Sequence, residues 1–319
     1  MTPGRSRLAV AVSSQYPDLR PDWPLLRRAL TDLGLVVSTE VWTDPHVPWS
    51  DFDLVVANGA WDNIHHPAEF LAWADATAPV APVVNTPATL RWNLDKHYLV
   101  DLAAAGVATV PTLWLRAANE AIRGLEDGAI EAGATGAGAL AAIPQGDVVV
   151  KPTVSGGGFQ TARYRVGEHR EAQNHIGHLL AGGRDVMVQP YQEAVDAEGE
   201  GGLIFLAGQF SHAVRKGPLL QRDVGPRSGL WEFEEISALE PTPAQLTTAR
   251  AALAAAEARL GPTTYARVDL VPLDDGTPAV LELELLDPAL FFEVHPQAAT
   301  RFAHVLARLI KEAPTAPGG

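Results

Sequence analysis

The chain has 319 residues, of which 47% are hydrophobic and 19% charged, a composition typical of a globular protein of about two or three packed units. Its formal net charge of −14 disfavours nucleic-acid binding, and the absence of cysteine excludes disulfides, thiolate catalysis and iron–sulfur clusters. No run reaches the roughly 18 apolar residues of a spanning helix, and the N-terminus lacks a signal-like segment. We therefore expect a cytoplasmic protein that binds neither nucleic acid nor a membrane.

Predicted strands and helices alternate through the first third of the chain. Apolar runs predict strands at 7–13, 35–42, 53–58 and 83–85. Helices are predicted over 24–33 and 67–75, and from an N-cap at Thr86 to about Ala105, just before Gly106. This alternation is typical of an open parallel sheet, so we assign residues 1–110 to an N-terminal α/β domain.

Residues 117–146 are rich in alanine and glycine and are interpreted as a helix end followed by a connection. Within them, GATGAG (133–138) resembles a nucleotide-binding loop. However, no strand precedes it, and it fits neither G-x-G-x-x-G nor G-x-x-x-x-G-K-[ST]. We therefore do not expect a phosphate site in this stretch.

From residue 147 onward the pattern consists mainly of strands. Strands are predicted at 147–152, 159–166 and 185–191, and LIFLAGQFSHAVRK (203–216) predicts a hairpin that turns near Gly208. A capping box at Thr242–Gln245 begins a helix that ends at Gly261, and a last helix begins near Pro296. The second half is therefore predicted to be α+β, with mostly antiparallel sheets.

Two late strands, TYARVDLVP and PAVLELELL, are joined by LDDGT (273–277), in which Asp-Gly is a strong hairpin signal. If Asp275 and Gly276 form a two-residue turn, the register places Asp269 opposite Glu282 and Arg267 opposite Glu284. All four side chains then share one face. The other face is predicted to be core, with the pairs Ala266–Leu285, Val268–Leu283 and Leu270–Leu281.

Three carboxylates at adjacent positions of one sheet face need compensation, because like charges opposite one another destabilise a sheet. Arg267 supplies one positive charge. A hard divalent cation such as magnesium would suit the oxygens of Asp269, Glu282 and Glu284. The alternative is a solvated acidic face with an Arg–Glu bridge, and a one-residue slip in register would separate the acids.

A phosphate-binding loop is predicted at KPTVSGGGFQT (151–161). An apolar strand leads to Lys151, and the three glycines after Ser155 allow the backbone to approach an anion closely. A strand follows instead of a helix, so the loop is not of the Walker type. The alternative is a flexible hairpin loop without a ligand.

The order of these features resembles the ATP-grasp superfamily over roughly residues 85–310. Within it, WNLDKHYLVDLAAAG (92–106) and LELELLDPALFFEVHP (281–296) resemble small actinobacterial carboxylate–amine ligases, the relatives of D-alanine–D-alanine ligase and of the cyclo-ligase of D-cycloserine biosynthesis. The resemblance implies an ATP-grasp fold. A Rossmann-like N-terminal domain would be followed by two α+β subdomains, 111–190 with the glycine-rich loop and 191–319 with the magnesium site, which hold ATP between them.

The resemblance also implies a role for each matching residue. ATP phosphates would be bound by Lys96 and Lys151 and covered by the loop Ser155, Gly156, Gly157 and Gly158. Adenine would be bound by the hinge Gln189, Pro190, Tyr191 and Gln192, and the ribose by Glu200. The catalytic cations would be Arg215 or Lys216, together with Arg267. The metal ligands would be Asp269, Glu282 and Glu284, for magnesium or, as an alternative, manganese.

The implied activity is ATP-dependent joining of a small-molecule carboxylate and an amine through an acyl phosphate. A kinase on the same fold and a non-catalytic nucleotide-binding protein remain alternatives. A homodimer is the assembly common among the relatives. The sequence names neither substrate, because the roles of Arg222, Arg227 and His295 stay open and ANGAWDN (57–63) lacks an expected basic residue.

Overall fold

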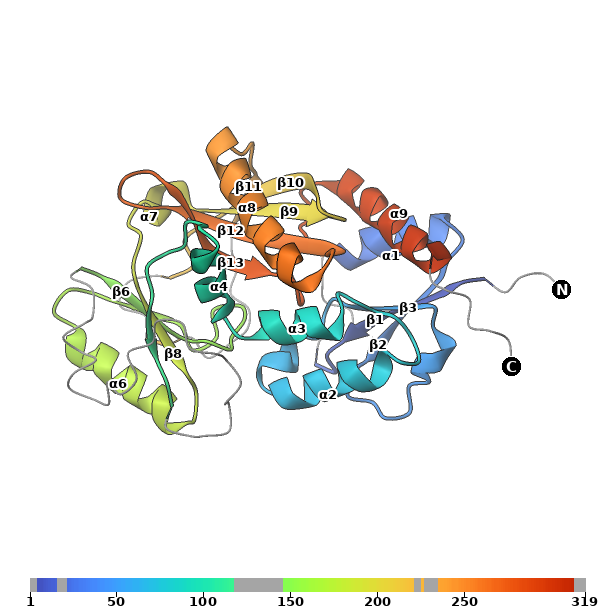
Figure 1. Cartoon of the computed structure of the whole chain (residues 1–319), viewed down its shortest axis with the longest axis horizontal. Helices are drawn as coiled ribbons and strands as arrows, with labels where there is room; N and C mark the ends of the chain where they lie inside the picture. The colour runs from blue at the N-terminus through green and yellow to red at the C-terminus, as the bar shows by residue number, and fades with distance from the viewer. Residues whose placement is uncertain (1–4, 16–21, 118–145, 221–224, 227–234, 313–319) are drawn as a thin grey trace.

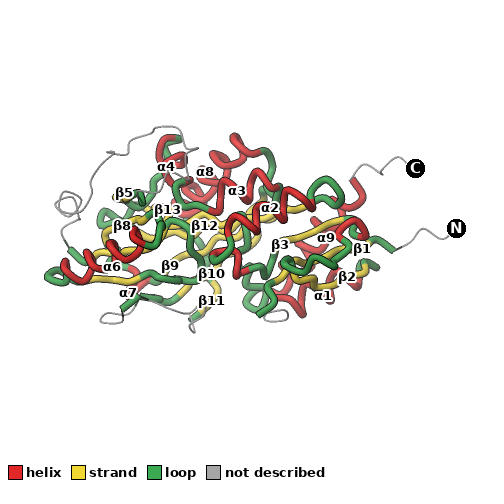
Figure 2. The backbone as a smooth tube through the Cα atoms, turned by 90° about the horizontal axis from the view of Figure 1, so that it is seen from below, coloured by secondary structure: helices red, strands yellow, loops and turns green. Residues whose placement is uncertain are grey.

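The computed structural model describes residues 5–15, 22–117, 146–220, 225–226 and 235–312. Three sheets occupy different parts of the molecule (Figure 1). Seen from below, α2, α3, α4 and α8 lie along one side of the strands (Figure 2). Within the described residues, no helix has the length and apolar character needed to cross a membrane.

The first sheet is parallel, as the alternating pattern predicts, with the strand order β2-β1-β3-β4. Its strands are β1 (Arg7–Val12), β2 (Val36–Val41), β3 (Leu54–Ala57) and β4 (Val83–Val84). They are connected through α1 (Asp22–Asp32) and α2 (Pro67–Thr77), with the short helices η1 (Trp49–Asp51) and η2 (Trp61–Ile64) in the loops. The strands β1 and β3 are almost wholly buried, which explains their continuous apolar sequence.

The second sheet is antiparallel and has the order β5-β8-β6-β7. It contains β5 (Leu113–Leu115), β6 (Val148–Pro152), β7 (Ala162–Tyr164) and β8 (Val186–Pro190), with α6 (His169–Ala181) packed against it. The strand β5 and the helix α6 are absent from the sequence-based prediction. The Ala- and Gly-rich stretch with GATGAG lies almost entirely outside the described residues.

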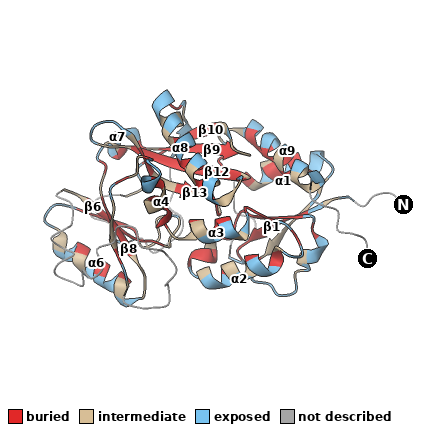
Figure 3. Ribbon diagram, in the orientation of Figure 1, coloured by how far each residue is buried: buried red, intermediate tan, exposed pale blue. Residues whose placement is uncertain are grey.

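The third sheet has the order β11-β10-β9-β12-β13, and its strands are antiparallel. It contains β9 (Glu200–Leu206), β10 (Gln209–Lys216), β11 (Ile236–Ala238), β12 (Tyr265–Pro272) and β13 (Pro278–Glu284), with α7 (Val195–Glu198) before β9. The helix α8 (Pro243–Leu260) covers one face and begins with the predicted capping box at Thr242. The central strands of this third sheet are largely buried, whereas the outer surfaces of the helices α6 and α8 are exposed (Figure 3).

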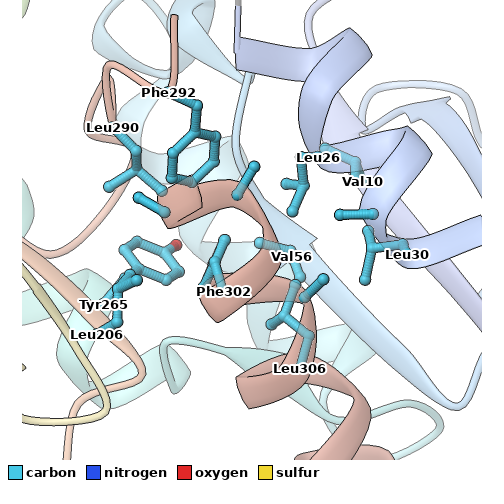
Figure 4. Packing of buried hydrophobic residues seen from close by; sticks show 14 of the residues in the cluster. Val10, Leu26, Leu30, Val56, Leu206, Tyr265, Leu290, Phe292, Phe302 and Leu306 are labelled. Atoms are coloured by element: carbon cyan, nitrogen blue, oxygen red, sulfur yellow. The ribbon is translucent and has the colours of Figure 1, made fainter. Parts of the chain in front are cut away.

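The last helix, α9 (Pro296–Glu312), joins the first and third sheets through one apolar core. Phe302 and Leu306 of this helix pack with Leu26 of α1, Val56 of β3 and Tyr265 of β12 (Figure 4). The C-terminal helix thus completes the core of the N-terminal sheet. The domain boundaries at 110 and 190 stay predictions.

The helix predicted from Thr86 to Ala105 is in fact two helices, α3 (Pro87–Leu94) and α4 (Tyr98–Ala104). The Asp95 carboxylate accepts the backbone N–H of His97 at 3.0 Å, and the backbone N–H of Lys96 donates to the carbonyl of Thr153 at 3.0 Å. These bonds replace helical ones, so the chain turns at Asp95–His97. The break directs Lys96 toward the β6 end of the second sheet.

The β12–β13 hairpin differs from its predicted turn. Leu273 and Thr277 close a three-residue loop with Gly276 at φ +80°, so the pairs near the turn are Pro272–Pro278 and Leu270–Val280. A bulge then adds one residue, Leu281, to β13 between the pairs Leu270–Val280 and Asp269–Glu282. The predicted pairs Asp269–Glu282 and Arg267–Glu284 are therefore present, whereas the predicted pair Leu270–Leu281 is wrong.

Candidate functional site

Two adjoining cavities lie where the three sheets meet. The loop cavity is bounded by the loop after β13 and by η2, with Trp61, Asn63, Ile64, Asp287, Ala289 and Phe291 in its wall. The hinge cavity is bounded by the segment after β8, with Gln189, Pro190, Tyr191, Gln192, Lys151 and Glu200 in its wall. Both cavities share a polar wall made of Lys96, Ser155, Gly156, Gly157, Lys216, Arg267, Glu282 and Glu284.

The three predicted metal ligands come together on this wall. Asp269, Glu282 and Glu284 each offer a carboxylate oxygen, and these oxygens all lie within 4.8 Å of one another. Asp269 is fully buried behind the wall, since its neighbour on β9, Gly202, has no side chain to occupy that space. Three hard oxygen donors at this spacing fit a magnesium-sized cation.

The charge of the carboxylates is compensated more fully than the sequence suggests. Lys96 Nζ lies 2.9 Å from Glu282 Oε1, and Lys216 Nζ lies 3.1 Å from Asp269 Oδ2. Arg267 binds Asp269 at 2.9 Å and also bonds to Glu284. The further compensation that the sequence analysis calls for is therefore present, in two lysines from distant elements that pair with the acids.

Lys151 is a further cation at the site, on β6. It is only 7% exposed and lines the hinge cavity. Among the described residues, its Nζ has no hydrogen-bond or ion-pair partner. Burial lowers the pKa of Lys151, and Glu282 nearby opposes that shift. A buried ammonium group on a cavity wall is suited to bind an anion there.

The glycine-rich loop lies between the two cavities, as a phosphate-binding loop would. Gly157 and Gly158 have φ of +58° and +75°, a backbone region that strains residues with a Cβ. Lys96 Nζ donates to the carbonyl of Ser155, which ties the loop to the helix break. At the loop tip, Phe159 packs edge-on against His65 of the N-terminal region, with ring centroids 4.8 Å apart.

The predicted hinge and Glu200 lie together at the hinge cavity. Gln189 is buried and donates to Thr112 Oγ1 at 2.9 Å. Glu200 begins β9, three residues earlier than predicted, and its carboxylate lies 2.8 Å from Lys216 Nζ. Lys216 therefore links Glu200 to Asp269.

The protonation states differ among the three acids. Burial raises the pKa of Asp269 and Glu282, but adjacent cations, Arg267 for the first and Lys96 for the second, lower each pKa below its usual value. Burial raises the pKa of Glu284 to about 7, despite the opposing effect of Arg267. Two of the three ligands are thus ionised at neutral pH, and a bound cation would favour ionisation of Glu284.

Several sequence-based candidates lie elsewhere. Arg215 points away from both cavities, and its guanidinium donates to the carbonyls of Ala197 and Glu198, so its placement does not support a catalytic role. Neighbouring strand residues point to opposite faces, which leaves Lys216 at the site. His295 lies outside both cavities, and its Nε2 donates to the carbonyl oxygen of Ala213 at 3.0 Å. Arg222 and Arg227 lie outside the described residues.

Sequence reasoning missed the residues that hold β13 in place. Asn93 of α3 bonds to the carbonyl of Leu283 and accepts the N–H groups of Leu285 and Leu286. The hydroxyl of Tyr98 accepts the N–H of Leu283 at 3.0 Å. The side chains of Asn93 and Tyr98 thus bond to backbone groups at the outer edge of β13. Both residues lie in the WNLDKHY stretch, which has no local pattern that predicts these bonds.

The contribution of the N-terminal region was also missed. Trp61, Asn63 and Ile64, from η2, form part of the loop cavity. These residues lie in ANGAWDN (57–63) or directly after it, where a basic residue is expected from the sequence. They give this part of the cavity wall apolar side chains and one side-chain amide instead of a positive charge. The two adjoining cavities together are lined by four cations, Lys96, Lys151, Lys216 and Arg267, and by several carboxylates, an arrangement suited to transfer of a charged phosphoryl group.

Comparisons with known proteins agree with this geometry. Residues 8–85 match the family model described as D-cycloserine synthetase DcsG, N-terminal domain. The chain is 37% identical over 294 residues to the cycloserine biosynthesis protein DcsG of Streptomyces lavendulae, covering 91% of this chain and 94% of that protein.

Solved structures show the same fold. The crystal structure of D-cycloserine synthetase DcsG superposes with a TM-score of 0.84 at 34% identity, over 96% of this chain and 100% of that one. D-alanine–D-alanine ligase from Bacillus anthracis complexed with ATP gives 0.59 at 13% identity, over 96% of both chains. The ATP-grasp ligase PsnB, complexed with a precursor variant, Mg and ADP, also gives 0.59 at 16% identity, over 96% of this chain and 99% of that one.

Proposed function

Because the chain belongs to the family of ATP-grasp ligases that includes D-cycloserine synthetase DcsG, we propose that it joins a carboxylate to an amine through an acyl phosphate, with release of ADP and phosphate. The observation that carries this proposal is the shared wall of the two cavities. It places Lys96, Lys216 and Arg267 between a cleft suited to a nucleotide and a separate cavity suited to a small molecule.

ATP would bind in the hinge cavity. The hinge Gln189–Gln192 would contact adenine, and Glu200 would accept hydrogen bonds from the ribose hydroxyls. Lys151 and Lys96 would bind the phosphates beneath the loop Ser155–Gly158. This placement is supported because both lysines line the cavity and Lys151 has no counter-ion contact among the described residues.

Magnesium would be held by Asp269, Glu282 and Glu284 and, when bound, would neutralise charge on the phosphate oxygens. Manganese has the same preference for oxygen ligands and is the alternative ion. Lys96 and Lys216 pair with Glu282 and Asp269 in this structure, so both lysines would shift toward the phosphates as the carboxylates take up the cation.

The substrate carboxylate would lie in the loop cavity beside Arg267. Its oxygen attacks the γ-phosphorus, and the bond from that phosphorus to ADP breaks. The amine nitrogen then attacks the acyl carbon, and phosphate leaves with the carboxylate oxygen while one proton passes to solvent. Arg267, with a pKa held above its usual value by Asp269 and Glu284 against the effect of burial, stays charged throughout and stabilises the negative charge that develops.

The substrates would be amino-acid-like molecules of natural-product biosynthesis. The relative from Streptomyces lavendulae is a cycloserine biosynthesis protein, and the apolar and amide groups of Trp61, Asn63 and Ile64 suit a small polar molecule with a short carbon chain. An amine and a carboxylate within one molecule would give a cyclic amide, and two molecules would give a linear one.

The test is ADP release from magnesium-ATP with a panel of amino acids and dipeptides, followed by mass measurement of the products. A product lighter by one water than its inputs is expected. A gain of one phosphate would instead identify a kinase, and would contradict the ligase mechanism. Arg267→Met should abolish product formation. Arg308→Met, the same substitution at an exposed arginine of α9 outside both cavities, is the matched control and should leave the rate unchanged.

A further inference from the structure

Arg163 of β7 is a buried arginine next to the site but outside its walls. Its side chain is 1% exposed, yet it lines neither cavity. The guanidinium carbon lies 3.4 Å from the ring centroid of Tyr191, which is a close stacking contact. Its Nε donates to Asp147 at 3.0 Å, and its Nη1 donates to both carboxylate oxygens of Asp196 at 3.0 and 3.1 Å.

These three partners belong to the elements that surround the nucleoside end of the hinge cavity. Tyr191 is a hinge residue and lines that cavity. Asp196 lies on α7, the short helix between the hinge and Glu200, and its Oδ1 accepts the Tyr191 hydroxyl at 2.5 Å. Asp147 immediately precedes β6, and its carbonyl accepts the Tyr191 N–H at 2.8 Å.

The chemistry of the contacts requires an arginine. A guanidinium is planar, so it stacks on an aromatic ring with one face while its edge donates to two carboxylates at once. A lysine ammonium offers neither the flat face nor the two diverging donor edges. Loss of the guanidinium would remove its hydrogen bonds to both carboxylates and its stacking contact with the ring of Tyr191.

We propose that Arg163 is a positioning residue for nucleotide binding: it fixes the hinge and α7, and through them Tyr191 and Glu200, in the arrangement that receives the nucleoside. This inference rests on the proposed function, because it takes the hinge cavity as the adenosine site. It predicts a defect confined to the nucleoside end. Lys96 lies at the α3–α4 break and Lys151 near the end of β6 that is farther from Asp147, and neither is a hydrogen-bond partner of Arg163 among the described residues.

The test is direct binding of ADP and AMP, measured by titration calorimetry, which requires no knowledge of the amino-acid substrate. Arg163→Met should weaken both nucleotides about tenfold and by the same factor, because they share the nucleoside. Lys151→Met should weaken ADP more than AMP, because it removes a phosphate contact. Arg163→Lys should behave like Arg163→Met. Arg165→Met, at an exposed arginine two residues along, is the control and should bind as the unaltered protein does.

A second variant guards against misfolding of the buried substitution. Asp196→Ala removes an exposed partner of Arg163 and should weaken both nucleotides about threefold. Binding of ADP within twofold of the unaltered protein by folded Arg163→Met and Asp196→Ala would overturn the inference, as would full binding by Arg163→Lys. Failure of the unaltered protein to bind ADP would overturn the proposed function itself, and the inference with it.

Discussion

Asp22, the first residue of α1, offers a sharp test of how the site loop is held. Its Oδ2 accepts the backbone N–H groups of Leu290 and Phe291 at 2.9 and 3.0 Å, and its Oδ1 accepts that of Phe292. The Asp22 residue is 4% exposed. Asp22→Ala would therefore leave three buried N–H groups without their acceptor.

The cost follows from these three bonds. A hydrogen bond to a charged group contributes about 1.5–3 kcal/mol, so three set an upper bound of roughly 4.5–9 kcal/mol. Water entering the vacated space would satisfy part of this demand, and we expect a loss of about 3–5 kcal/mol. Phe291 adds to the effect, since its φ of +53° is strained for a residue with a side chain and needs these bonds to hold it.

The loop also bears on the site. The carbonyl of Ala289 accepts Arg267 Nη1 at 3.2 Å, and the Phe291 ring lies 5.5 Å from the guanidinium carbon. Asp22→Ala should therefore lower the ligase rate as well as the stability. The Arg267 side chain would lose its support on the loop side.

The assay is urea unfolding followed by tryptophan fluorescence. Asp32→Ala is the control, because Asp32 lies on the same helix but its side chain is 71% exposed, and its pair with Arg28 spans 3.9 Å. Such an exposed pair contributes about 0–1 kcal/mol. A loss below about 1 kcal/mol for Asp22→Ala would refute the reasoning, since the orphaned N–H groups alone should cost more.

Three further outcomes are expected. Burial lowers the pKa of His212 to about 4, so as the pH falls this imidazole is protonated in the unfolded chain before it is protonated in the folded one. The free energy of unfolding should therefore fall by up to about 3 kcal/mol between about pH 6.5 and pH 4. His212→Gln should reduce this pH dependence, measured by urea unfolding at pH 7 and pH 5. Manganese binding, followed by electron paramagnetic resonance, should be weak without ADP, because Lys96 already pairs with the carboxylate of Glu282. Lys96→Met should bind manganese at least tenfold more tightly. Equal binding by both proteins would contradict the idea that the metal ion displaces Lys96 from Glu282. Tyr98→Phe should cost about 1–3 kcal/mol, because it removes the acceptor for a buried N–H of β13, and an unchanged urea midpoint would exclude that function.

Much of the architecture can be predicted from local sequence, because most strands of each sheet are apolar runs long enough to identify. The parallel first sheet, the hairpin near Gly208 and the capping box before α8 are all present as predicted. The strand β5 and the helix α6 were missed. The first is only three residues long, and its pairing with β8 depends on a segment distant in sequence.

The helix break at Lys96 shows why part of the site escapes local reasoning. In LDKHYLV, only Asp95 competes locally with a helix, through its bond to the His97 N–H, and Asp, Lys and His are all tolerated in a helix. The position of Lys96 is fixed by the Thr153 carbonyl, which accepts its backbone N–H, and by the Glu282 carboxylate, which pairs with its ammonium group. Both partners lie more than 50 residues away, so the position of Lys96 is a property of the assembled fold.

The β12–β13 hairpin makes the converse point, since its acid cluster was placed correctly on incorrect grounds. The turn has one residue more than an Asp-Gly two-residue loop, which by itself would put Glu282 and Glu284 on the wrong face. The bulge at Leu281 adds a second residue and restores the alternation. It also turns the Leu281 side chain to the hinge cavity, where Val271 accompanies it. The bulge therefore has two effects: it places Glu282 opposite Asp269, and it supplies an apolar side chain to the cavity wall beside the carboxylates.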